Sequence, residues 1–131
     1  MTRMNRIAIP AFFLLLVLPL RAHHSFSSEY NITAQIRLKG EITGVEWTNP
    51  HVFVTMAVRD ENGELQQWHV EGGAVRFLNA SGWTSEMLHQ MVRAHETIAI
   101  NGYLARRNAG PVLGAWGKEI EMTDGRRLPF N

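Results

Sequence analysis

The chain has 131 residues, with 13 Lys and Arg against 12 Asp and Glu, and its sequence contains no cysteine. The lack of cysteine excludes disulfides, thiolate metal sites and cysteine nucleophiles. Because Arg3, Arg6 and Arg21 all precede residue 23, the rest of the chain is mildly acidic, which argues against nucleic acid as a partner.

The amino-terminal segment has the layout of a secretory signal peptide. Two arginines precede an apolar run over residues 7–20, and the small Ala22 fits the position before a cleavage site. The unbroken apolar core, residues 11–18, is much shorter than the roughly 20 residues of a membrane-spanning helix, so we expect no stable span after cleavage. We therefore expect residues 1–22 to be removed, the mature chain to begin at His23, and the protein to be periplasmic or secreted.

Three strands are predicted in the first half of the mature chain. Residues 37–47 and 52–58 alternate between apolar and polar side chains, and residues 64–71 follow a turn signal and alternate in the same way. Gly44 lies where the first alternation changes parity, which predicts a β-bulge that bends this strand. Residues 23–36 are interpreted as an amino-terminal segment outside the barrel.

A helical segment and two further strands are predicted next. Residues 74–91 have helical spacing, with Gly82 as a helix stop and Thr84 as the cap of a second helical turn. Strand patterns return at residues 97–104 and 112–122. The predicted order of elements is therefore βββαββ.

This order is that of the OB-fold, a small and partly open Greek-key barrel of five strands. We therefore predict a mainly β, OB-like barrel over residues 37–131. A β-sandwich or another small half-open barrel is the alternative architecture.

Short motifs spread over nearly the whole mature chain carry a resemblance to a known family. They are Ala22-His23-His24-Ser25-Phe26, Leu38-Lys39-Gly40, Val45-Glu46-Trp47, Asn49-Pro50-His51, Glu71-Gly72-Gly73, Gly82-Trp83 and Asp124-Gly125-Arg126. Together they resemble a family of small exported bacterial proteins of uncharacterised function, a domain of unknown function. The resemblance implies export and a single β domain but no activity. The segment 93–96 departs from the turn usual in that family, so His95 inherits no role from it.

Two histidines stand directly after the expected cleavage site. If His23 is the amino terminus, its α-amine and its ring nitrogen can chelate one metal ion together, and His24 adds a second imidazole. Such ligands suit Cu(II), and less distinctively Zn(II) or Ni(II). His51 is the third predicted ligand, because Pro50 stiffens the turn that carries it. The alternative is a solvated terminus, with His51 making a structural hydrogen bond.

A ligand surface on the barrel is also predicted. Its possible members are Trp47, Asn49, Trp68 and Glu71. The four tryptophans of the chain are also explained as core residues, and their exposure decides between these interpretations. Strand parity places His69 and Glu71 on one side, where a solvated pair is the simpler interpretation.

The leading functional expectation is a non-enzymatic exported binding module whose barrel face holds a small ligand or another envelope protein. Copper handling at the processed amino terminus is the alternative. Glu46 and Glu71 suggest acid–base chemistry, but strand alternation does not show that they converge, and the sequence contains no familiar catalytic motif. We therefore expect no enzyme activity and no organic cofactor, and the sequence indicates no oligomeric state.

Overall fold

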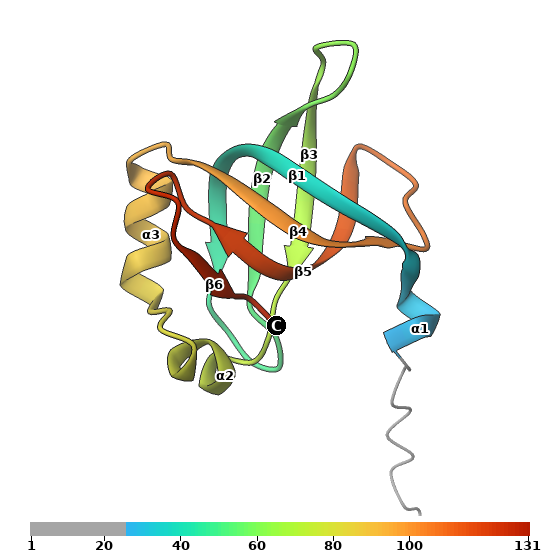
Figure 1. Ribbon diagram of the computed structural model, residues 1–131. Helices are drawn as coiled ribbons and strands as arrows, with labels where there is room; N and C mark the ends of the chain where they lie inside the picture. The colour runs from blue at the N-terminus through green and yellow to red at the C-terminus, as the bar shows by residue number, and fades with distance from the viewer. Residues whose placement is uncertain (1–25) are drawn as a thin grey trace, which may run out of the picture.

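The computed structural model describes residues 26–131 (Figure 1). The expected signal peptide, its cleavage after Ala22, and the predicted ligands His23 and His24 lie outside the described residues. The elements are α1 (Phe26–Glu29), β1 (Tyr30–Glu46), β2 (Phe53–Arg59), β3 (Leu65–Glu71), α2 (Val75–Ala80), α3 (Ser85–Arg93), β4 (Thr97–Ala105), β5 (Val112–Glu121) and β6 (Arg127–Pro129). In the described part of the chain, no helix is long and apolar enough to cross a membrane.

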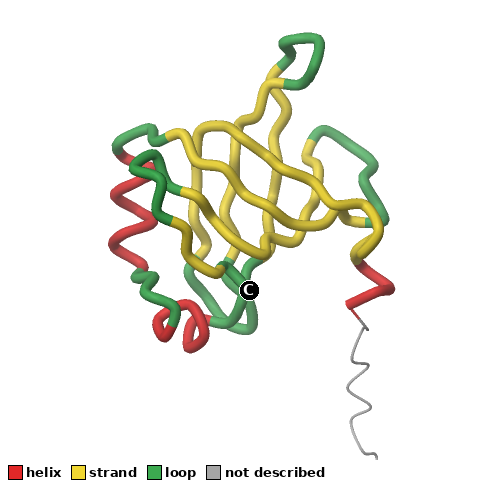
Figure 2. Tube along the Cα trace, in the orientation of Figure 1, coloured by secondary structure: helices red, strands yellow, loops and turns green. Residues whose placement is uncertain are grey.

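The strands form one sheet in the order β3-β2-β1-β4-β5-β6, and β3 also pairs with β5 in parallel. This parallel pairing joins the two ends of the sheet and closes a barrel of five strands, with the short β6 added beside β5 (Figure 2). The predicted mainly β, OB-like fold is confirmed. The barrel is closed rather than partly open, because β3 and β5 stay in register from Gln67 to Glu71.

Strand β1 is long and bent, and it belongs to both halves of the barrel. Its register against β2 shifts between Ile42 and Gly44, so the predicted bulge is confirmed. The strand begins at Tyr30 rather than at residue 37, because its first half pairs with β4 before its second half pairs with β2. Residues 30–36 of the segment that we expected to precede the barrel are therefore strand.

The side chains at alternating strand positions point inward, fill the barrel and form its core. Val54 and Met56 of β2 and Val70 of β3 are fully buried, as their parity predicts. Helix α3 begins where Thr84 accepts a hydrogen bond from the Met87 backbone N–H, so the predicted cap is confirmed. Helices α2 and α3 lie along one side of the barrel, and α1 lies on the opposite side (Figure 1).

Candidate functional site

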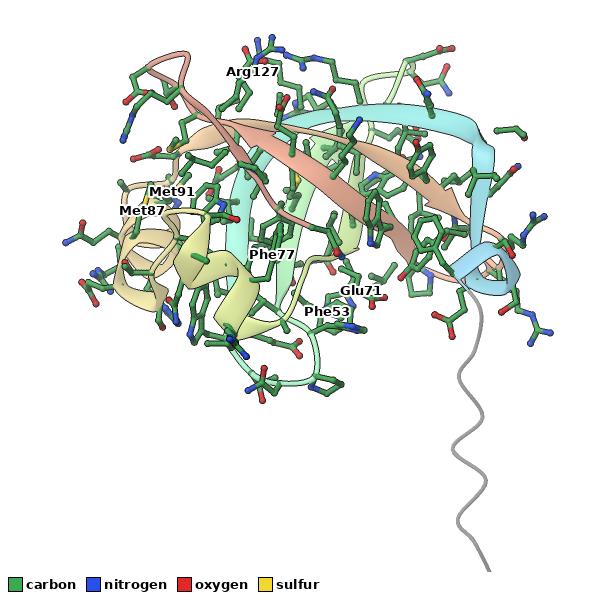
Figure 3. The ribbon with its side chains drawn as sticks, turned by 60° about the horizontal axis from the view of Figure 1, so that its bottom comes forward. Phe53, Glu71, Phe77, Met87, Met91 and Arg127 are labelled. Atoms are coloured by element: carbon green, nitrogen blue, oxygen red, sulfur yellow. The ribbon has the colours of Figure 1, made fainter. Side chains whose placement is uncertain are left out.

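A row of outward-facing side chains crosses four elements at the end of β3. Glu46 is the register partner of Phe53, Phe53 is the partner of Glu71, and Glu71 is the partner of Trp116. Register partners in a sheet stand on the same face, so these four residues form a continuous band, which we call the Glu71 belt. Figure 3 shows Phe53 and Glu71 side by side on the barrel.

Glu71 holds the imidazole of His51 at the centre of this belt. The Nδ1 atom of His51 lies 2.5 Å from Oε1 of Glu71, and the two side chains are 47% and 13% exposed. An ionised carboxylate only accepts hydrogen bonds, so Nδ1 of a neutral His51 must carry the proton. The other ring nitrogen, Nε2, is then left with its lone pair on a half-exposed ring.

The loop between β1 and β2 positions His51 through contacts on both sides of it. Asn49 Oδ1 accepts a hydrogen bond from the backbone N–H of Val75 at 3.3 Å, which ties the loop to the start of α2. The backbone N–H of Val52 donates to the carbonyl of Gly73 at 3.0 Å, and the N–H of Gly72 donates to the carbonyl of Val52 at 2.8 Å. These contacts fix the backbone that carries His51 against the residues that follow Glu71.

The second oxygen of Glu71 accepts a hydrogen bond from the hydroxyl group of Tyr30. Burial raises the pKa of Tyr30, and the hydrogen bond to the Glu71 carboxylate raises it further. The phenol therefore stays protonated and remains a donor. The ring of Phe26 lies 5.3 Å from the Tyr30 ring and 4.9 Å from the Trp116 ring, so α1 covers this side of the belt.

The raised pKa of Tyr30 predicts how the stability of the fold depends on pH. Above about pH 10, the ordinary tyrosine pKa, the unfolded chain loses a proton that Tyr30 in the fold keeps, so the free energy of unfolding should fall. Urea unfolding at several alkaline pH values measures this, with Tyr30→Phe as the control. We expect a steeper fall in the wild type, and equal slopes would contradict the coupling.

His69, the histidine of β3, pairs with a different carboxylate. His69 Nε2 lies 3.3 Å from Glu46 Oε1, and the His69 ring stacks on Phe53 with 4.4 Å between ring centroids. The interpretation of His69 and Glu71 as a solvated pair is therefore wrong, because Glu71 contacts His51 and Tyr30 instead. The two carboxylates flank Phe53, and each holds its own histidine.

The structure places the four members of the predicted ligand surface in different surroundings. Trp68 is only 7% exposed and belongs to the core, because its strand parity points the ring into the barrel. Trp47 is partly buried and packs against the core, and the side chain of Asn49 accepts the hydrogen bond from Val75. Of the four predicted members, Glu71 is the one that the structure places in the belt.

Two members of the site went unrecognised in the sequence. Tyr30 lies in the segment that the strand pattern leaves outside the barrel, and its contact with Glu71 spans 41 residues of the chain. Phe53 has the outward parity between the inward Val52 and Val54, and no motif marks it as a site residue. An aromatic residue at an outward strand position is a signal that could have found it.

The histidines and carboxylates of residues 26–131 do not gather into a ready-made metal site, since no group of three such side chains could hold an ion. The chemistry available at the belt is an oriented imidazole nitrogen, a carboxylate that is already paired, and partly buried aromatic rings.

The comparisons with known proteins agree with the resemblance seen in the motifs. No curated protein matches the chain. A family model described as a family of unknown function, DUF6152, matches residues 14–111 and thus most of the chain, including β1 to β4. The chain therefore belongs to DUF6152, a family of unknown function.

Proposed function

We propose that this chain is an exported, non-enzymatic binding module that acts through the Glu71 belt. The signal-like layout of residues 1–22 supports export to the periplasm or the medium. The belt supports binding rather than catalysis, because Glu46 and Glu71 are each engaged by a histidine on opposite sides of Phe53. We further propose that the occupant is a Cu(II) ion.

The observation that carries this proposal is the contact between His51 Nδ1 and Glu71 Oε1. Histidines that bind metals almost always donate their other ring N–H to a carboxylate, a carbonyl or water, which fixes the tautomer and the orientation of the ring. Glu71 supplies this contact for His51, and Tyr30 in turn holds Glu71 through its second oxygen. An imidazole that is half exposed as a side chain and oriented by a carboxylate is the arrangement that a metal ligand needs.

The other ligands in this proposal are His23 and His24. Phe26, where the described chain begins, contacts Tyr30 and Trp116, and both of these residues neighbour Glu71. In the sequence, His23 and His24 precede Phe26 by three and two residues. Imidazole and amine nitrogens favour Cu(II), with Ni(II) and Zn(II) as weaker alternatives.

The other occupant expected from the sequence is a small ligand or an envelope protein. It would contact the rings of Phe53 and His69 on the same face. These two rings already stack on each other, and the His69 ring reaches Glu46. Their arrangement is therefore explained without a ligand, whereas Nε2 on the half-exposed His51 side chain has a direct chemical use in metal binding.

Titration of the processed protein with Cu(II) against a competing chelator tests the proposal. We expect one equivalent to bind, with an affinity that falls by about tenfold or more in His51→Asn. The intact mass of the exported protein should show at the same time that His23 is the first residue.

His95→Asn is the matched control, because His95 is another exposed histidine whose Nδ1 contacts a carboxylate, Glu41, at 2.6 Å. His95 has a positive φ of 53°, a conformation that asparagine tolerates well. This variant should bind Cu(II) like the wild type. Equal losses in both variants, or no loss in His51→Asn, would overturn the assignment of His51.

A further inference from the structure

Three methionines line one cavity on the far side of the barrel from α1. Met87 and Met91 come from α3, and Met122 directly follows β5. The cavity has a volume of about 380 Å³ and lies between the helix and the turn that joins β5 to β6. None of these residues takes part in the Glu71 belt.

The positions of the methionines follow from the elements that carry them. Met87 and Met91 are four residues apart on α3, so their side chains lie on the same face of the helix, as Figure 3 shows. Met91 and Met122 are buried, and Met87 is partly buried where it packs against the core. All three line the cavity, and the unbranched side chain of methionine, with its three rotatable bonds, adapts to the space beside it.

The rim of the cavity carries two carboxylates and one guanidinium group. Glu96 and Asp124 line it together with Arg126. The guanidinium group of Arg126 is held by Asp124, with 2.7 Å between Nε and Oδ2, so its charge is balanced locally. The Glu96 carboxylate then favours a cation over an anion in this space.

A cavity that is lined by thioether sulfurs and favours a cation suits a soft metal ion. Among protein ligands, thiolates and thioethers select Cu(I), whereas hard divalent ions prefer oxygen. We propose that Met87, Met91 and Met122 form a binding site for Cu(I). This proposal does not rest on the His51 site, because it uses a different ion and different residues.

The test is a competition titration of the full processed chain with Cu(I) under reducing conditions, against a coloured Cu(I) chelator. The wild type should hold one equivalent, and the double variant M87L/M91L should lose affinity by about tenfold or more for each thioether removed. Leucine keeps nearly the same volume, so the packing should survive, and circular dichroism and the melting temperature check that it does.

Met56→Leu is the matched control, because Met56 is fully buried inside the barrel and does not line the cavity. This variant should bind Cu(I) like the wild type. If M87L/M91L is unstable, the Cu(I) affinity of the single variant Met87→Leu is measured instead, because Met87 is only partly buried. X-ray absorption of the Cu(I) protein should show sulfur neighbours that decrease in these variants.

Three results would overturn the proposal: no Cu(I) retained by the wild type, equal affinities in M87L/M91L and Met56→Leu, or a spectrum with nitrogen and oxygen neighbours alone. The His51 proposal is tested separately with Cu(II) and His51→Asn. Either proposal can therefore fail without the other.

Discussion

Replacing Trp83 with alanine should lower the free energy of unfolding by about 3–5 kcal/mol, the cost of removing a fully buried aromatic side chain. The indole ring packs edge-on against Phe130 with 6.3 Å between ring centroids. Its Nε1–H donates to the carbonyl of Pro129 at 2.8 Å. Trp83 thus connects the segment between α2 and α3 to the carboxyl-terminal end of the chain. Alanine at this position leaves a cavity and removes the donor to the Pro129 carbonyl.

Urea unfolding of the purified variants measures this effect. Trp83→Phe should keep part of the packing and lose about 1–3 kcal/mol, because the Pro129 carbonyl remains without its donor. Phe77→Ala in α2 is the control, since that ring is 42% exposed and its loss should change stability by about 0.5 kcal/mol. Equal destabilisation by Trp83→Ala and Phe77→Ala would contradict this view of the core.

Replacing Glu71 with alanine should change both stability and metal binding. The buried hydroxyl of Tyr30 loses its acceptor, which costs about 1–3 kcal/mol of unfolding free energy. The His51 ring loses the carboxylate that orients it, and the loss of such a contact weakens metal binding by about 10–100-fold. Urea unfolding and the Cu(II) competition titration measure the two effects on the same protein sample.

Glu46→Ala is the matched control for Glu71→Ala. Glu46 also belongs to the belt and also contacts a histidine, but its side chain is 62% exposed, so we expect a change of about 0.5 kcal/mol and unchanged Cu(II) affinity. A double-mutant cycle with Tyr30→Phe isolates the coupling between Tyr30 and Glu71. Additive effects in that cycle would show that the hydrogen bond contributes nothing to stability.

Local features of the fold could be predicted from the sequence because each has a short-range cause. The parity of Val54, Met56 and Val70 follows from strand geometry, and the cap at Thr84 needs only the residues beside it. The bulge at Gly44 was visible as a change of parity within one strand. The early start of β1 was not visible, because it depends on pairing with β4, which lies far along the chain.

The site was less predictable than the fold, because its contacts join residues that lie far apart in the sequence. His51 and Glu71 were each selected as candidates, but their contact requires the loop before β2 and the end of β3 to meet in space. Tyr30 reaches Glu71 only because β1 extends beyond the predicted boundary. Trp68 differs from these residues, because local sequence was enough to place it. Its parity in β3 predicts an inward ring, which argues against a place on the ligand surface.

The spin-resonance spectrum of the Cu(II) protein with ¹⁵N-labelled histidine tests the central claim most directly. If Glu71 orients His51 as a metal ligand, the wild type and His95→Asn should show the same imidazole nitrogens, and His51→Asn should show one fewer. Identical spectra for the wild type and His51→Asn would contradict the claim, because the ion would then be held without His51.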